Sequence, residues 1–265
     1  MTIQQFENLL RKEDYAENTI LAYQYALKEF RSRFREVNRM NLKLYKLYLI
    51  ASFRPQTVNL RIQGINKFLE YSGKPEWKLK TTRVPIFSFC NNVISNEDYA
   101  FFIKRLKKET DLKWYFAVRY MAATGARVSE LVQMKVENVR EGFFDVYSKG
   151  GKYRRLYIPG PLRAETLDWI DRDSGYLFMN KNGGCITPRG IASQLRHYAI
   201  QYGMDPHTVH PHAFRHFYAK NFLDRHNDLA LLADLLGHRN LSTTRIYLRR
   251  SSQEQQQLID RIVVW

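Results

Sequence analysis

The chain has 265 residues, and its 45% hydrophobic and 14% aromatic content indicates packed cores and argues against an intrinsically disordered protein. Its 42 lysines and arginines against 26 acidic residues give a formal net charge of +16, which indicates a polyanionic partner, most often nucleic acid. Charge alone leaves open a ribosome-associated or merely basic protein.

Cysteine usage and the apolar segments bear on the compartment. Cys90 and Cys185 form no C-x-x-C pair, so neither a disulfide framework nor a zinc ribbon is indicated, and two isolated thiols suit a reducing compartment. No signal peptide is visible at the N-terminus, and the longest apolar stretch, near Leu47–Phe53, is too short to cross a bilayer. We therefore expect a soluble, cytoplasmic protein without membrane contacts, and the length favours two domains.

Residues 1–80 are expected to form a small basic bundle of helices. Apolar residues recur at helical spacing over 19–30, behind Asn18 as the expected N-cap. A second apolar run covers 42–53, and a third follows Pro55 and ends near residue 73. Residues 81–94 contain a proline and no helical period, which predicts a linker between domains.

The second domain, 95–265, is expected to contain a small β-sheet among helices, so that the fold class is mainly α with some β (α+β). A capping sequence at Ser95 begins a helix, and a buried helix over 112–123 is ended by Gly125. Two β-prone runs, 143–147 and 153–158, flank a pair of glycines and predict a hairpin.

Further helices are expected toward the C-terminus. Thr187 followed by proline predicts a helix that runs to residue 200, and others are expected over 214–223 and 229–236. The last of these should end at Gly237, and Ser242 should cap the helix that follows it.

Two clusters supply cations. Arg127 follows a small-residue turn and shares a helix face with Glu130, although a surface ion pair would look the same. Lys149 and Lys152 flank two glycines in the expected hairpin, where a lysine suits contact with a phosphate or protonation of a leaving oxygen. The alternative is a solvated lysine in a turn.

Two more clusters contain histidines. His212 and Arg215 lie one helical turn apart, and a guanidinium can bind two phosphate oxygens at once. His210, His212 and His216 have ligand-like spacing, so zinc is the competing interpretation, although no nearby cysteine or acid completes the shell. Gly237 exposes His238, and Tyr247 follows on the next expected helix, where a tyrosine is most often core or amphipathic surface.

In order and spacing, these clusters resemble the tyrosine recombinases, the family of phage-type integrases and Xer-type resolvases. Four motifs carry the resemblance: the family's T-G-x-R-x-x-E-L box, its lysine hairpin, its H-x-x-R-H box and its segment L-G-H-x-x-x-x-T-T-x-x-Y, which match Thr124–Leu131, Ser148–Lys152, His212–His216 and Leu236–Tyr247. The one departure is Ser148, where the family often has glycine.

The resemblance implies a site-specific recombinase that cleaves and rejoins duplex DNA through a 3′-phosphotyrosine, without metal, ATP or another cofactor. An N-terminal core-binding bundle and a catalytic domain would close on the DNA as a C-shaped clamp. Tyr247 would attack the phosphate, which Arg127, Arg215 and His238 would bind. His212 would be the base and Lys152 the acid. Glu130 and His216 would have supporting roles.

The terminal segment 252–265 begins with a capping sequence and carries one apolar stripe. It could dock on its own domain, but in the family such a helix inserts into the neighbouring subunit and closes a homotetramer on DNA. A type IB topoisomerase shares most of these catalytic residues, and a non-catalytic DNA-binding relative would share the fold. Both are alternatives, although none of the catalytic side chains is missing here.

Overall fold

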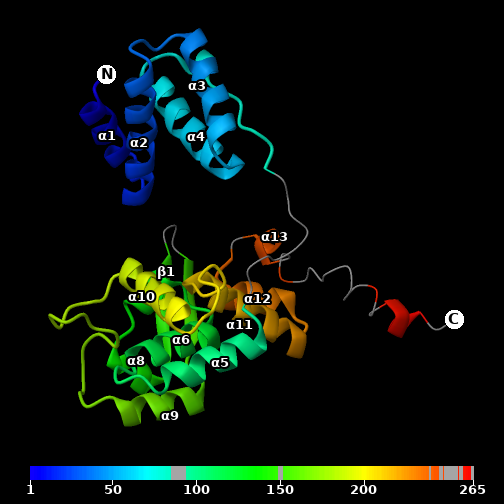
Figure 1. Ribbon diagram of the computed structural model, residues 1–265. Helices are drawn as coiled ribbons and strands as arrows, with labels where there is room; N and C mark the ends of the chain where they lie inside the picture. Colours follow the sequence, from blue (N-terminus) through cyan, green and yellow to red (C-terminus); the bar gives the residue numbers. More distant parts are fainter. Residues whose placement is uncertain are drawn as a thin grey trace. The chain divides into compact units, whose positions relative to one another are not determined.

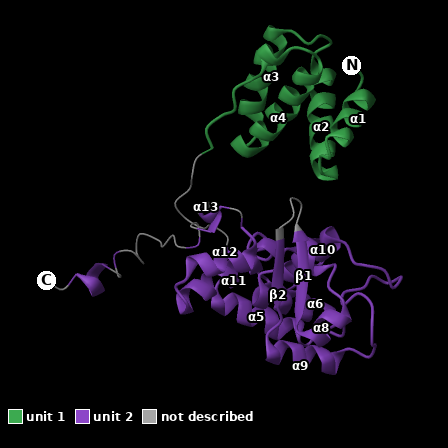
Figure 2. Cartoon of the chain, turned by 180° about the vertical axis from the view of Figure 1, so that it is seen from behind, with its two compact units in different colours: residues 1–86 green, residues 87–265 purple. Residues whose placement is uncertain are grey.

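The computed structural model describes residues 1–84, 94–148, 152–238, 240–244, 247, 256 and 259–263, with the backbone alone at 148, 152 and 242. The chain forms two compact units, Met1–Ile86 and Phe87–Trp265 (Figure 2). The expected division into domains at 80 and 95, with a linker between them, stays a prediction, because residues 85–93 lie outside the described part.

The first unit is a helical bundle, as the sequence predicts (Figure 1). Its elements are α1 (Ile3–Lys12), α2 (Glu17–Arg33), α3 (Arg39–Ser52), α4 (Pro55–Tyr71) and the 3₁₀ turn η1 (Pro75–Trp77). Helices α2 and α4 approach closely at Gly64, where a Cβ would lie 3.0 Å from the Cα of Tyr23. Residues 81–84 follow α4, whose Asn59 hydrogen-bonds the backbone of Thr82 in both directions.

The expected N-cap of the second helix is wrong. Helix α2 begins at Glu17, so Asn18 lies in its first turn, and the capping position is Ala16, which makes no side-chain cap. Glu17 places a carboxylate at the positive end of the helix dipole and accepts hydrogen bonds from Arg11 at 2.7 and 2.8 Å. This salt bridge ties the start of α2 to α1.

The second unit combines helices with a two-stranded antiparallel sheet (Figure 1). Its elements are α5 (Asn96–Leu106), α6 (Lys113–Thr124), α7 (Val128–Leu131), α8 (Val136–Glu141), β1 (Phe143–Ser148), β2 (Lys152–Tyr157), α9 (Gly160–Trp169), α10 (Pro188–Gln201), α11 (Pro211–Arg225), α12 (Leu229–Leu236) and α13 (Leu241–Thr244). This confirms the expected α+β class, the hairpin and the helix that begins after Thr187.

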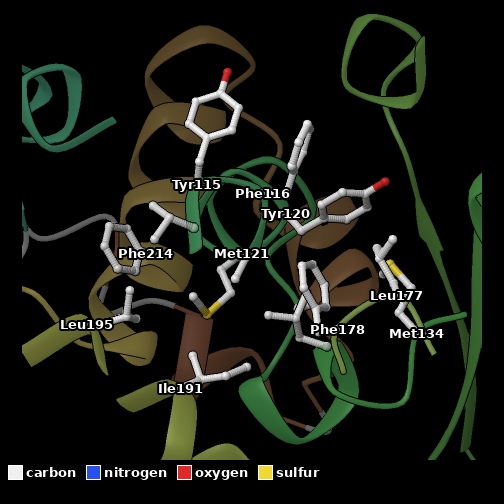
Figure 3. Close-up of a cluster of buried hydrophobic side chains, with 14 of the residues drawn as sticks. Tyr115, Phe116, Tyr120, Met121, Met134, Leu177, Phe178, Ile191, Leu195 and Phe214 are labelled. Atoms are coloured by element: carbon white, nitrogen blue, oxygen red, sulfur yellow. The ribbon is translucent and has the colours of Figure 1, made fainter. Parts of the chain in front are cut away.

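Helix α6 lies at the centre of this core (Figure 3). Its Tyr120 and Met121 are fully buried, and Phe178 and Phe214 reach the same cluster from other segments. Ile94 is also buried in this core, so the chain is already part of the second unit before α5 begins. The buried helix expected over 112–123 is confirmed, and it fixes the position of the turn that follows it.

The expected C-terminal helix is described only in part. Residues 259–262 are helical, but most of 252–265 lies outside the described residues, so its docking in its own subunit or in a neighbour stays a prediction. Among the described residues, none of the helices has the length and apolar character needed to span a membrane.

Candidate active site

The turn between α6 and α7 presents Arg127. Helix α6 ends at Gly125 with φ +62°, and a Cβ there would lie 2.6 Å from the ring of Tyr218, so the turn requires glycine. Arg127 is the N-cap of α7, and its Nη1 lies 2.8 Å from Oε1 of Glu130. The arginine side chain is 36% exposed and the glutamate 9%, so the guanidinium is open on one side while its partner is buried.

The hairpin is confirmed, but its lysines are not described as side chains. Strands β1 and β2 pair in the register Phe143↔Tyr157, which places Ser148 opposite Lys152 at the end of the hairpin next to residues 149–151. Lys149 lies outside the described residues, as does the side chain of Lys152. Their expected roles stay predictions.

Helix α11 carries the H-x-x-R-H box. Its proline at N1 and the imidazole of His210, which accepts from the amide of Ala213 at 3.2 Å, fix where it begins. Arg215 is 3% exposed and donates to the carbonyl oxygens of Gly125 at 2.5 Å and Leu236 at 2.7 Å. Its Nη2 also lies 3.1 Å from Nε2 of His238. One guanidinium therefore joins α11 to the Arg127 turn and to the end of α12.

His238 and Tyr247 lie next to this arginine. Helix α12 ends at Gly237 with φ +63°, and Nδ1 of the following His238 lies 2.8 Å from Oγ1 of the buried Thr244. The rings of His238 and Tyr247 are nearly parallel, with centroids 6.4 Å apart. The phenol oxygen of Tyr247 lies 3.1 Å from Nδ1 of His216.

One expectation about this segment is wrong. Helix α13 begins at Leu241, so Ser242 lies inside it and is not its cap. Thr244 of this helix is buried, and its Oγ1 lies against Nδ1 of His238. Residues 245 and 246 lie outside the described residues, so the expectation that Tyr247 belongs to the same helix stays a prediction.

The structure thus brings together Arg127, Arg215, His238 and Tyr247 from three separate motifs. His216, which the sequence suggests only as a supporting residue, is the histidine in contact with the phenol oxygen. His212, the expected base, has its ring centroid 6.4 Å from that of His216. The H-x-x-R-H box contains His216, but its contact with Tyr247 joins residues 31 positions apart, which the box itself does not indicate.

Sequence reasoning missed Arg154. This arginine in β2 is 9% exposed, and its Nη2 lies 2.5 Å from Oε2 of Glu130. In the sequence, Arg154 is one of two adjacent arginines in a strand that follows a lysine-containing turn. Nothing in the residue spacing therefore distinguishes it from the solvent-exposed kind of strand residue that Arg155 is. Only the fold shows that Arg154 faces the Arg127 turn.

Burial and neighbouring cations make the site receptive to an anion. Burial, followed by repulsion from Arg127 and Arg154, lowers the pKa of Arg215 to about 10. Burial and adjacent cationic groups lower the pKa of His216 and of His238 to about 4 each, so both imidazoles are neutral at pH 7. An anion bound here would relieve the repulsion between arginines.

These histidines predict an acid-sensitive fold. Their folded pKa values of about 4 lie below the ordinary 6.5, so the unfolded chain takes up protons first as the pH falls. Their contribution to stability is complete above pH 6.5 and is lost as the pH falls from 6.5 to 4. Urea unfolding at pH 7 and pH 5 measures the loss, and His216→Gln should reduce it. An equal loss in the variant would contradict the assignment.

The histidines do not form a metal centre in the described structure. No group of three or more histidine, cysteine or acidic side chains that could hold a metal ion occurs among the described residues. His210 instead caps α11, and Nδ1 of His216 faces Tyr247. The competing zinc interpretation of the three histidines therefore lacks a ligand set there.

A cleft of about 710 Å³ opens beside these groups. Its lining includes Arg127 and Glu130, His238 and Thr243, and Phe144 and Tyr147 of β1. The cleft therefore places an exposed guanidinium and a neutral imidazole where a phosphodiester could approach both.

Comparison with known proteins agrees with this geometry. Residues 92–254 match the model of the phage integrase family. The chain is similar to tyrosine recombinase XerA of Pyrococcus furiosus, with 29% identity over 271 residues that cover 98% of this chain and 93% of the relative.

Solved structures share the fold. The Tn1549 transposon integrase in complex with transposon right end DNA superposes with a TM-score of 0.74 at 15% identity, covering 100% of both chains. XerH site-specific recombinase bound to difH substrate gives a TM-score of 0.72 at 19% identity, covering 98% of this chain and 84% of the other.

Proposed function

The chain belongs to the phage integrase family and is a tyrosine site-specific recombinase, and we propose that it cleaves and rejoins duplex DNA with Tyr247 as the nucleophile. The observation that carries the assignment is the convergence of Tyr247, His238 and the buried Arg215. Without His238 and Arg215 beside it, Tyr247 would be an ordinary aromatic residue.

The proposed cleavage is an in-line exchange at phosphorus. The phenol oxygen of Tyr247 forms a bond to the scissile phosphorus, and the bond from phosphorus to the 5′ oxygen breaks. Charge grows on the non-bridging oxygens, where Arg127 and Arg215 would stabilise it with His238 as a further donor. The product is a 3′-phosphotyrosine with a free 5′ hydroxyl, and a partner strand's 5′ hydroxyl reverses the reaction on a new strand.

Two protons must move in this exchange. A free phenol has a pKa near 10, so an attacking tyrosine needs a base close by. His212 is the base that the motif suggests, while Nδ1 of His216, 3.1 Å from the phenol oxygen, is a hydrogen-bond partner that would orient the phenol. The 5′ oxygen needs a proton as it departs, and Lys152 is the proposed donor. No step requires ATP or a metal.

Duplex DNA containing a recombination site is the proposed partner. Solved relatives of the same fold are bound to transposon end DNA and to difH substrate. The net charge of +16 suits binding through many phosphates, with both units contributing. We further propose a homotetramer on DNA, linked by exchange of the segment 252–265, and a cytoplasmic site of action.

Covalent trapping tests the function. The protein is incubated with fragmented genomic DNA, denatured, and recovered with any covalently attached strand, which is then sequenced. We expect a defined sequence attached through its 3′ phosphate to Tyr247. Adducts spread over unrelated sequences would instead indicate a topoisomerase, and the absence of any adduct would indicate a non-catalytic DNA-binding relative.

The general acid is tested with a bridging sulfur at the 5′ position of the scissile phosphate. A thiolate leaves without protonation, so Lys152→Ala should be severely slow on ordinary DNA and nearly normal on the sulfur substrate, as measured by the rate of adduct formation. Arg127→Ala should stay slow on both, because its charge acts on the phosphate oxygens.

Lys149→Ala is the matched control from the same hairpin. It should weaken DNA binding without any rescue by sulfur. If sulfur rescues Lys149→Ala and leaves Lys152→Ala inactive, the two lysines have exchanged roles. If sulfur rescues neither variant, the proton comes from another group.

A further inference from the structure

We propose that Arg154 is a positioning residue of this site, which holds Glu130 against Arg127 and fixes the end of α12 beside His238. The inference rests on the proposed function and deepens it. Arg154 lies in β2, outside the four motifs, and its side chain is as buried as that of Glu130, at 9% exposure each.

The first half of the argument is the shared carboxylate. Oε2 of Glu130 accepts from Arg154 Nη2 at 2.5 Å and from the amide of Arg127 at 2.6 Å, and its Oε1 accepts from Arg127 Nη1 at 2.8 Å. Both oxygens are therefore engaged, and Arg154 fixes the rotation of the carboxylate that orients Arg127. Arg154 also neutralises part of the negative charge of Glu130. Arg127 is therefore not fully neutralised by this carboxylate and can still attract an incoming phosphate.

The second half is the contact with α12. Nη1 of Arg154 donates to the carbonyl of Leu235 in the last turn of this helix, where the exposed carbonyls attract a cation. The stem of Arg154 packs on Gly237, because a Cβ there would lie 2.5 Å from Arg154 Cδ. His238 follows directly. The same guanidinium thus fixes the backbone from which His238 projects.

Only arginine suits both contacts. Its planar guanidinium presents separate donors in fixed directions, one to Glu130 and one to Leu235. A lysine ammonium is a point charge at the end of a flexible stem and cannot hold both partners in the same geometry. Misplacement of a catalytic group by about 1 Å can cost about 100-fold in rate.

The test compares Arg154→Met and Arg154→Lys with Arg155→Met. Arg155 is the next residue of β2, 38% exposed and paired with Asp145 at 2.8 Å, so it matches Arg154 in chemistry but not in position. Adduct formation is measured at saturating protein on a duplex carrying the trapped sequence. We expect Arg154→Met to be slower by about 100-fold, Arg154→Lys to recover only part, and Arg155→Met to stay within about threefold.

A methylphosphonate at the scissile position separates positioning from a general folding defect. Its neutral centre needs less help from arginine, so the defects of Arg127→Ala and Arg154→Met should shrink together on this substrate. In the double variant, the part of the Arg154→Met defect that acts through Arg127 should vanish, so the combined defect should be smaller than the product of the two single defects. Defects that multiply, or an Arg154→Met defect unchanged on the methylphosphonate, would overturn the proposal.

Failure of the proposed function has a different signature. If the unaltered protein forms no adduct on any sequence, the proposed attack by Tyr247 is wrong. The contact between Arg154 and Glu130 is then tested only by the unfolding midpoints of the variants. Arg154→Met and Glu130→Gln should each lower the midpoint, and the shift in the double variant should be smaller than the sum of the two single shifts. Additive shifts would overturn the coupling between Arg154 and Glu130.

Discussion

Tyr247→Phe is expected to abolish the covalent DNA adduct while leaving DNA affinity nearly unchanged. The substitution removes only the phenol oxygen that would bond to phosphorus, and it keeps the ring that lies against His216 and His238. Electrophoresis after denaturation measures the adduct, and a filter or mobility-shift assay on the same duplex measures affinity. The loss should be complete, because the reaction needs this atom.

Tyr218→Phe is the matched control for this prediction. Tyr218 lies on α11 in the same small apolar cluster as Tyr247, next to Gly125, and its burial raises the pKa of its phenol. A buried phenol with a raised pKa is a poor nucleophile, so this variant should form adduct normally. A normal adduct from Tyr247→Phe, combined with loss in Tyr218→Phe, would mean that the nucleophile is Tyr218.

The parts of the site that the sequence predicts are those fixed by local rules. Gly125 had to end α6 because the chain turns there with positive φ. Arg127 and Glu130 pair as their spacing predicts, although not on one helix face: Arg127 is the extended N-cap of α7, and Glu130 reaches back to it from the third position of that helix. The hairpin and the helix behind Thr187 follow from turn and capping residues in the same way. Each of these needs only a few adjacent residues.

The parts that the sequence does not predict depend on contacts between distant segments. Glu130 and Arg154 are 24 positions apart, and nothing within either segment indicates that they pair. His216 meets Tyr247 across 31 positions, so this contact depends on how α11 lies against the segment that follows α12. Local capping and spacing carry no information about such a contact.

Removal of either Arg127 or Arg215 should slow cleavage severely, but only the removal of Arg215 should lower the free energy of unfolding. Each guanidinium acts on charge that develops in the transition state, where loss of one such donor costs about 100- to 1,000-fold in rate. Arg127 is 36% exposed, so Arg127→Ala should leave the unfolding free energy within about 1 kcal/mol of the original.

Arg215→Ala differs because the arginine is also a structural link. Its removal leaves the carbonyls of Gly125 and Leu236 without this donor in a buried site, at a cost of about 1 to 3 kcal/mol for each such group. Urea unfolding and single-turnover adduct formation, measured on both variants, separate the two roles, and DNA affinity should change far less than rate. Adduct formation within about tenfold of the original in either variant, about 1.4 kcal/mol of barrier, would contradict a clamp of two arginines. Unchanged stability in Arg215→Ala would instead mean that water replaces the guanidinium at both carbonyls.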